Sequence, residues 1–204
     1  YAVGMIEFHQ MQNFANTMST ELAAVKVRLE QKTMVETFKN QSIHDALTSI
    51  LNRRGFFEKL HECYAESMES GKKLALVSID MDGLKYINDT FGHNEGDVAI
   101  CFTAAALTRV CGEAFFCARV GGDEFMAAGL VGEELAESFG RKLKEEFDLY
   151  NAACLHSYRV GFSMGMLYDT VKKDVPVTEF IRMADERMYA QKAEHRKQKG
   201  YIGR

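Results

Sequence analysis

The sequence predicts an α+β domain in which helices pack on a ferredoxin-like sheet of order β-α-β-β-α-β. Three observations support this fold class: short apolar runs alternate with longer amphipathic stretches, two strand-like runs follow each other across a glycine pair, and no internal repeat interrupts the order. With 204 residues, of which 47% are hydrophobic and 26% charged, the chain can build one well-packed domain and an appendage.

The appendage is predicted over residues 1–42 as an amphipathic linker helix. It has no Gly or Pro from residue 5 to about residue 38, and its apolar positions recur every three or four residues: Met11, Phe14, Met18, Leu22, Val25 and Leu29. A helix this long with one apolar stripe needs a partner, so a dimeric coiled coil is one interpretation. Because no clean heptad is present, a helix folded back on the domain is the alternative.

The globular domain is predicted over residues 43–204 and opens with a helix. Residues 45–54 lead into a helical pattern that ends near Gly71. Residues 74–79 are almost wholly apolar, which is typical of a strand buried on both faces, and Asp80 follows at the strand end.

The next predicted helix runs to Cys111, and we expect Gly92 and Gly96 to break its first part. Gly121 and Gly122 predict a hairpin, because both residues tolerate positive φ. The remaining elements are predicted as strands over 115–120, 124–130 and 156–166, and helices over 133–150 and 178–197, the last behind Pro176.

Charge and cysteine content restrict the function classes. The formal charge of −4 gives no basic field, so we expect no nucleic-acid partner. Five cysteines without a C-x-x-C pair disfavour disulfides and zinc, and indicate the cytoplasm. No apolar run or signal peptide predicts direct membrane contact. Since the chain starts at Tyr1, we expect an upstream sensor domain, in a protein that is either free or membrane-anchored.

Two carboxylates are predicted to meet at one edge of the sheet. Asp80 ends one strand and Asp123 lies in the hairpin, and in a β-α-β-β-α-β sheet these strands are neighbours. Such oxygens suit Mg²⁺, which takes one or two carboxylates beside substrate phosphates. A glycine hairpin also lets a triphosphate approach the backbone. Taken alone, the Asp80-Met81-Asp82 segment is more typical of a solvated loop, and the glycine pair is what favours a ligand site.

Residues 119–125, Arg-Val-Gly-Gly-Asp-Glu-Phe, resemble the signature of the GGDEF family of diguanylate cyclases. Further family segments recur in order: Asp45-x-Leu47-Thr48 with Asn52-Arg53-Arg54, then Asp80-x-Asp82-x-x-Lys85-x-x-Asn88-Asp89-x-x-Gly92-His93-x-x-Gly96-Asp97, and Ala184-Asp185 through Tyr189, Lys192 and Arg196. The resemblance covers about residues 43–198. It implies a fold like that of nucleotidyl cyclases and polymerase palms, and the condensation of two GTP into cyclic di-GMP with release of two pyrophosphates.

The resemblance also implies individual roles. Two Mg²⁺ ions, or Mn²⁺ in their place, would be held by Asp80, the Met81 carbonyl and Asp123. The catalytic residues would be Asp123, as the base for the ribose 3′ proton, and Lys192. Substrate binding would involve Lys85, Asn88, His93, Asp97, Gly121, Gly122 and Arg196, with Asn88 and Asp97 on the guanine edge. For His93, stabilising the turn is an equal alternative.

The chain departs from the family where product inhibition would occur. The family has Arg-x-x-Asp ahead of its signature, whereas this chain has Gly112 and Phe115 at those two positions. We therefore expect no product-inhibition site there, because the arginine supplies the bidentate contacts. In the last helix, His195 and Lys197 replace the usual Gly and Asn. The resemblance therefore gives weaker support for phosphate contacts in this helix than elsewhere.

One domain of this family binds one GTP, so the reaction implies a homodimer whose geometry the linker helix and an upstream sensor control. The alternative is a catalytically weak module that binds GTP and regulates a partner. A cyclase with a mixed guanine–adenine product is a third interpretation, which Asp97 disfavours.

Overall fold

The computed structural model describes residues 18–19, 21–22, 25–28, 43–153 and 156–197. The chain divides into two compact units, Tyr1–Ser42 and Ile43–Arg204. In the first unit the described residues are helical, and Met18, Leu22 and Val25 are exposed. The remainder of the predicted linker helix lies outside the described residues, and its pairing stays a prediction.

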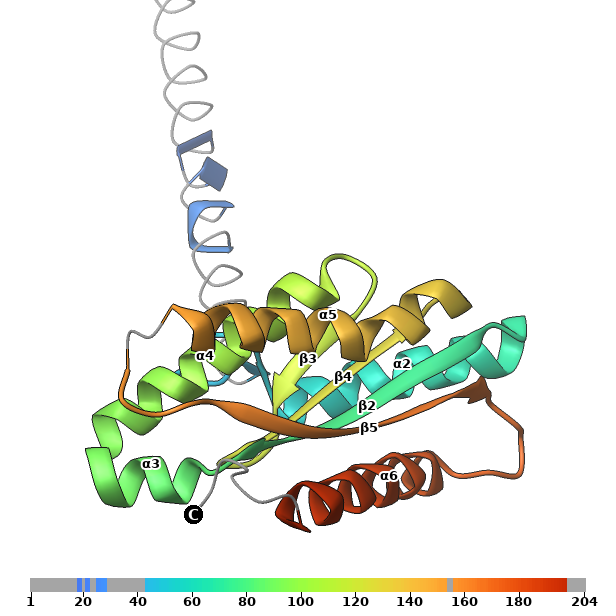
Figure 1. The fold of residues 1–204 in the computed structure, drawn as a ribbon. Coiled ribbons are helices and arrows are strands. Elements are labelled where there is room, and N and C mark those ends of the chain that lie inside the picture. Colours follow the sequence, from blue (N-terminus) through green and yellow to red (C-terminus); the bar gives the residue numbers. More distant parts are fainter. Residues whose placement is uncertain (1–17, 20, 23–24, 29–42, 154–155, 198–204) are drawn as a thin grey trace, which may run out of the picture. The chain divides into compact units, whose positions relative to one another are not determined.

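The second unit contains a five-stranded sheet with the order β1-β3-β4-β2-β5 (Figure 1). Its elements are β1 (Leu51–Asn52), α2 (Arg53–Ser70), β2 (Lys73–Asp82), α3 (Leu84–Phe91), α4 (His93–Cys111), β3 (Phe116–Arg119), β4 (Glu124–Leu130), α5 (Glu133–Ala152), β5 (Gly161–Thr170) and α6 (Val177–Lys197). Strand β2 pairs antiparallel with both β4 and β5, and β3 pairs antiparallel with β4. The order β2-α4-β3-β4-α5-β5 is that of the predicted fold class, which is confirmed.

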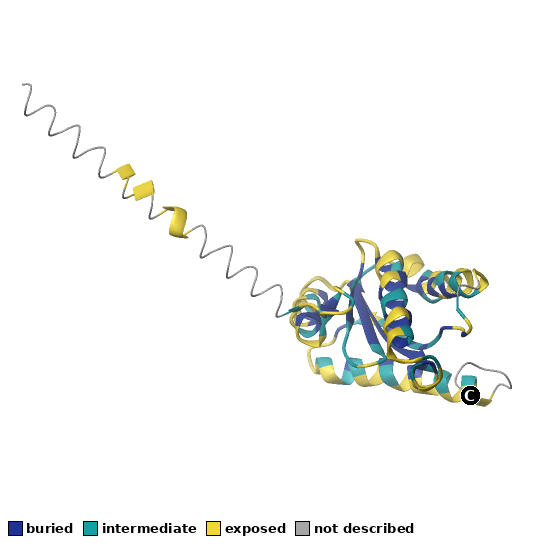
Figure 2. Cartoon of the chain, turned by 90° about the vertical axis from the view of Figure 1, so that its left-hand side faces the viewer, coloured by how far each residue is buried: buried dark blue, intermediate teal, exposed yellow. Residues whose placement is uncertain are grey.

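Both faces of the sheet are covered. Figure 1 shows α4 and α5 on one side of the sheet and α6 on the other, and Figure 2 shows the strands buried between the helices. Val77 and Ile79 of β2 belong to the core shared with α4 and α5, whereas Leu74 and Leu76 belong to the core shared with α2 and α6. Because side chains alternate along a strand, Ser78, Asp80 and Asp82 continue the row that faces α6.

The predicted last strand was wrong in its bounds, since β5 covers 161–170 rather than 156–166. Val160 precedes the strand because both of its backbone groups bond to the Asn151 side chain instead of a neighbouring strand. Val160 N–H donates to Asn151 Oδ1 and Asn151 Nδ2 donates to the Val160 carbonyl, both at 2.8 Å. At the other end, pairing with β2 extends to Thr170 opposite Lys73. Similarly, β2 continues past Ile79, so Asp80 lies within the strand rather than at its end.

The glycines behave differently from the prediction at two places. Gly92 separates α3 from α4 as expected, with φ of 93°, but Gly96 lies inside α4. The hairpin between β3 and β4 forms, yet neither Gly121 nor Gly122 is among the described glycines with positive φ. A Cβ added at Gly121 would lie 2.5 Å from Glu124 Oε2, so a larger residue there would displace the end of the Glu124 side chain.

Two further features were not predicted. Strand β1 is only two residues long and pairs in parallel with β3. Its second residue, Asn52, caps α2 by accepting a hydrogen bond from Gly55 N–H at 3.0 Å. Among the described helices, none is both long and apolar enough to cross a membrane.

Candidate active site

The row of polar residues on β2 is paired, residue by residue, with α6. Ser78 Oγ donates to Asp185 Oδ1 at 2.5 Å, and one step along the strand Lys192 Nζ donates to Asp80 Oδ1 at 2.6 Å. Asp80 is only 5% exposed, so its charge is largely removed from water. These pairs fix how α6 sits on the strand and place Lys192 beside Asp80.

The third pair along this row is a relay through β5. Ser163 Oγ lies 3.0 and 3.1 Å from the two oxygens of Asp82, and 3.0 Å from His195 Nδ1. An ionised carboxylate only accepts hydrogen bonds, so the single Ser163 hydroxyl hydrogen goes to Asp82. His195 Nδ1 must then carry the hydrogen that it donates to Ser163. Ser163 is fully buried and Asp82 is 4% exposed, so this relay ties the end of α6 to two strands.

The hairpin brings Asp123 to the same edge as Asp80. Met81 N–H donates to the Asp123 carbonyl at 2.8 Å, and Asp80 pairs in register with Glu124, the residue after Asp123. The predicted metal ligands Asp80, Met81 and Asp123 are therefore neighbours. Their convergence follows from the antiparallel pairing of β2 and β4.

The electrostatics of this edge suit a bound cation. Burial raises the pKa of Asp80, and the nearby charges of Asp123 and Asp82 raise this pKa further, while the hydrogen bond and charge of Lys192 lower it in part. The Lys192 ammonium thus takes the place of a cation at the Asp80 carboxylate. No three acidic, imidazole or thiol side chains converge as a metal cage within the described part of the chain. Two carboxylates and a carbonyl nevertheless fit Mg²⁺, which completes its shell with water and phosphate oxygens.

Arg119 connects the hairpin to the turn at residues 45–48. Its Nε and Nη2 donate to the Gly122 carbonyl at 3.2 and 2.9 Å, and its Nη1 contacts Asp45 Oδ1 at 3.4 Å. Asp45 in turn accepts hydrogen bonds from the Thr48 N–H and hydroxyl. The turn at residues 45–48 is therefore connected to the loop that carries Asp123.

The predicted guanine ligands lie on α3 and the start of α4. Asn88 is half-buried on α3, and its Oδ1 would lie 1.9 Å from a Cβ added at Gly96. Glycine is thus required at residue 96 so that the Asn88 amide can pack on α4. Asp97 follows directly and is exposed, as are Lys85 and His93. The structure brings Asn88 and the Gly96–Asp97 turn together.

The other predicted positions lie around this edge. Gly122 is exposed, with no atom within 4 Å of an added Cβ, so its backbone is open to a ligand. Arg196 is exposed near the end of α6. Gly112 ends α4 with a φ of 51°, and Phe115 is buried against Phe139 at a centroid distance of 5.0 Å. The residue that stands in place of the family's aspartate is therefore part of the core.

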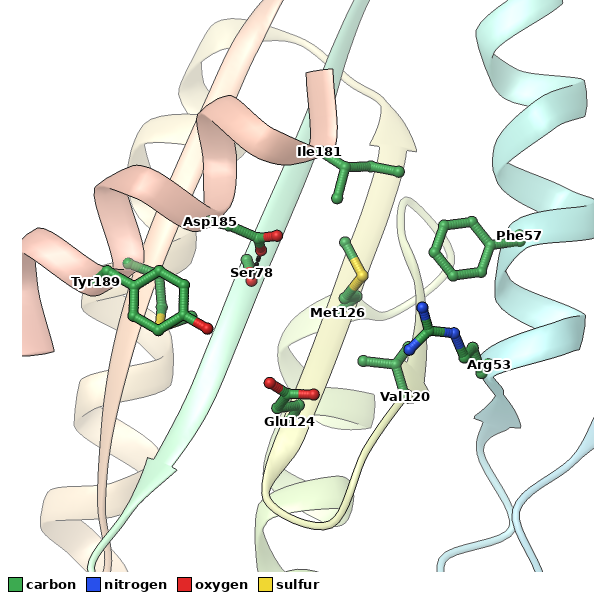
Figure 3. Close-up of a pocket in the computed structure, with 10 residues that line it drawn as sticks. Arg53, Phe57, Ser78, Val120, Glu124, Met126, Ile181, Asp185 and Tyr189 are labelled. Atoms are coloured by element: carbon green, nitrogen blue, oxygen red, sulfur yellow. Dashed lines mark hydrogen bonds between the residues drawn. The ribbon is translucent and has the colours of Figure 1, made fainter. Parts of the chain in front are cut away.

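A pocket of about 100 Å³ opens beside the hairpin, between α2 and α6 (Figure 3). Its lining includes Arg53, Glu124, Asp185 and Tyr189, and none of its lining residues belongs to the predicted site set. Asp185 is also the partner of Ser78, one pair along β2 from Asp80. We assign no ligand to this pocket.

Sequence reasoning missed several residues that organise the site. Ser163 and His195 were not assigned a role, although the alternation of Ser78, Asp80 and Asp82 in an apolar strand signals polar partners on one face. Arg119 lay inside the recognised motif without a role. No local pattern predicts its contact with Asp45, because the two residues are 74 positions apart.

Known proteins resemble this chain across the described site. The family model "Diguanylate cyclase, GGDEF domain" matches residues 42–198. The probable diguanylate cyclase DgcJ of Escherichia coli K12 is 29% identical over 159 residues, covering 78% of this chain and 31% of DgcJ. The diguanylate cyclase DgcN of the same strain is 27% identical over 196 residues, covering 91% of this chain and 45% of DgcN. The chain thus spans less than half the length of these curated relatives.

Among solved structures, the coiled coil and GGDEF domain of DgcB from Caulobacter crescentus, in complex with c-di-GMP, superposes with a TM-score of 0.76. It is 25% identical and covers 87% of this chain and 95% of the DgcB chain. The family match includes β2, the hairpin and α6, the three elements that build the edge described above. With the family model matching well over half of its residues, this chain belongs to the diguanylate cyclase GGDEF domain family.

Proposed function

We propose that this chain condenses two GTP molecules into cyclic di-GMP and releases two pyrophosphates. The observation that carries the proposal is the Met81 N–H to Asp123 carbonyl hydrogen bond of 2.8 Å, which sets the hairpin acid beside buried Asp80 and Lys192. Family membership and the names of the curated relatives support this reaction class.

Mg²⁺, or Mn²⁺ in its place, would be held by the Asp80 and Asp123 carboxylates and the Met81 carbonyl, two ions per active site. Bound there, it would neutralise the charge that develops on the transferring phosphoryl group. The excess negative charge around Asp80 supports this assignment. Because Lys192 contacts Asp80 directly, we expect its ammonium to turn toward substrate phosphate once a cation takes over that carboxylate.

The protein side chains would then align the reactants. Asp123 takes the ribose 3′ proton while that oxygen attacks the α-phosphorus of the second GTP, and pyrophosphate leaves. The Asn88 amide hydrogen-bonds the guanine edge, and the Asp97 carboxylate accepts from the N1 and amino donors of guanine. The exposed cations Lys85 and Arg196 neutralise phosphate charge.

Each domain would contribute one GTP, so the active species would be a homodimer with two domains face to face. Exposed apolar side chains in the described part of residues 1–42 support pairing through that segment. An upstream sensor would act through the same segment, with the domain itself in the cytoplasm.

The test is incubation of the full chain with GTP and Mg²⁺, followed by chromatographic separation of products. Cyclic di-GMP is expected from the natural chain, and Asp123→Asn should lower its formation by more than about 100-fold. Asp174→Asn, the same change at an exposed loop position, serves as the control. Tight GTP binding without product, even at high protein concentration, would replace the proposal with a GTP-binding regulatory module.

A further inference from the structure

The loop between α5 and β5 is fastened to the first turn of α4. The Tyr158 hydroxyl lies 3.1 Å from the Glu95 carbonyl and 2.9 Å from Glu95 Oε2, so it donates to both. His156 Nδ1 lies 3.0 Å from the same Oε2. Tyr158 is 8% exposed, and burial together with the Glu95 carboxylate raises its pKa, so the hydroxyl remains a donor.

This fastening reaches the predicted base-binding residues through the backbone. Glu95, Gly96 and Asp97 are consecutive in α4, and successive helical residues turn by about 100°. Glu95 and Asp97 therefore point to nearly opposite sides of the helix, Glu95 toward the loop and Asp97 toward solvent. Between them, Gly96 packs against Asn88. The turn is thus held from the loop side while its other side presents Asn88 and Asp97.

Ring contacts extend the same support to α3. Phe91, the last residue of α3, packs on Tyr158 with ring centroids 5.3 Å apart. From Tyr158 the row of rings continues to His156 and then to Tyr150, with ring centroids 5.2 and 5.7 Å apart. Tyr150 in turn stacks on Phe102 of α4 at a centroid distance of 3.7 Å. Both helices that carry the predicted guanine ligands therefore rest on one row of aromatic rings.

We propose that Glu95 and Tyr158 are positioning residues for base recognition, which hold Asn88 and Asp97 in the one arrangement that matches the guanine edge. The proposal rests on the function proposed above and adds that base selectivity depends on the α5–β5 loop. Hydrogen-bond recognition fails steeply with small displacements, because a bond weakens below about 120° and beyond about 3.2 Å. Apart from Lys85 on α3, the proposed phosphate and metal contacts lie on β2, the hairpin and α6, so phosphate binding should be much less sensitive to this support.

The experiment measures equilibrium binding of GTP, ITP and ATP in the presence of Mg²⁺ to the chain carrying Asp123→Asn, so that GTP is not consumed during the measurement. ITP lacks only the guanine 2-amino group, so the ratio of the ITP and GTP dissociation constants reports the base edge alone. For Tyr158→Phe we expect this ratio to fall about tenfold, the equivalent of one good hydrogen bond. ITP keeps the N1 donor and should weaken less than GTP, and ATP affinity should be unchanged within about twofold. Tyr168→Phe is the matched control, because it removes a similar hydroxyl, 3.1 Å from the Val131 carbonyl, on strand β5 that follows the loop.

A second pair of variants distinguishes positioning from general damage. Glu95→Gln keeps an acceptor for Tyr158 and should retain most of the selectivity, whereas Glu95→Ala should lose it as Tyr158→Phe does. If Tyr158→Phe does not fold, Glu95→Ala decides alone. Full selectivity in Glu95→Ala or in a folded Tyr158→Phe variant would overturn the proposal. Equal binding of GTP and ATP by the chain that carries Asp123→Asn alone would instead refute the proposed function.

Discussion

The negative charge of ionised Asp80 destabilises the folded chain. Its pKa is raised by burial first and by Asp123 and Asp82 second, even with Lys192 in contact. A raised pKa means that the neutral carboxyl is favoured in the fold, so the penalty is absent at low pH and grows as the pH rises through the folded-state value. This penalty is the kind of local instability that a cation-binding site tolerates.

We therefore expect Asp80→Asn to stabilise the metal-free chain at pH 7 while abolishing product formation. The amide oxygen can still accept from Lys192, and the buried charge is gone, so the gain should be about 0.5–2 kcal/mol. Urea unfolding at pH 7 and at about pH 4 measures it, and the gain should be smaller at the lower pH, because a raised pKa means that more of Asp80 is protonated there. A variant less stable than the natural chain at pH 7 would contradict this account.

At the scale of elements, the turn before β1 supports the hairpin that carries Asp123 through Arg119. Burial alone would raise the pKa of Asp45, but hydrogen bonds from Thr48 and the contact with Arg119 outweigh burial and hold this pKa below its ordinary value of 3.8. Since the folded pKa is depressed, the ionised form stabilises the fold. That stabilisation is complete above the unfolded-state pKa and is lost as the pH falls through the folded-state pKa.

Asp45→Asn should consequently lower the free energy of unfolding by about 1 kcal/mol at pH 7. The difference from the natural chain should shrink as the pH falls below the ordinary value of 3.8 and Asp45 becomes protonated in the folded state. Turnover should also fall, because Arg119 loses the partner that orients it on the Gly122 carbonyl. Asp174→Asn is again the control, and an unfolding difference that does not shrink as the pH is lowered would refute the role of the charge.

Elements with a strong local pattern could be predicted from the sequence, and those set by long-range partners could not. Residues 124–130 form a strand as predicted, since they are a short, mostly apolar run after the glycine pair, and the strand is buried on both faces. The start of β5 is set by the Asn151 side chain, which local apolar alternation does not reveal. At Gly165, an added Cβ would lie 2.2 Å from the Ala184 carbonyl, so glycine there serves the packing of α6.

The candidate site divides in the same way. The proximity of Asp80 and Asp123 could be predicted from the sequence, because the fold class determines which strands are neighbours. The relay of His195 through Ser163, and the contact of Tyr158 with Glu95, depend on residues 32 and 63 positions apart. Such pairings follow from the packing of α6 and of the α5–β5 loop, and no spacing rule encodes them.

At the scale of the whole molecule, a reaction that joins two GTP needs two active sites, and residues 1–42 are the segment available to bring them together. Residues 43–204 form a compact unit of their own with both sheet faces covered, so we expect this unit to fold and bind GTP without the segment. Without a tether, encounter of two domains becomes bimolecular.

The specific activity of residues 43–204 should therefore rise in proportion to protein concentration, whereas that of the full chain should be constant over the same range. Initial rates from about 0.1 to 50 μM, with sedimentation measured in parallel, test this. Leu22→Glu in the full chain should reproduce the behaviour of the truncated protein, because Leu22 is 72% exposed and carries the apolar stripe. Leu22→Ile keeps that stripe and should not. Equal, concentration-independent activity in all four proteins would mean that the globular units pair by themselves and that residues 1–42 do not organise the active dimer.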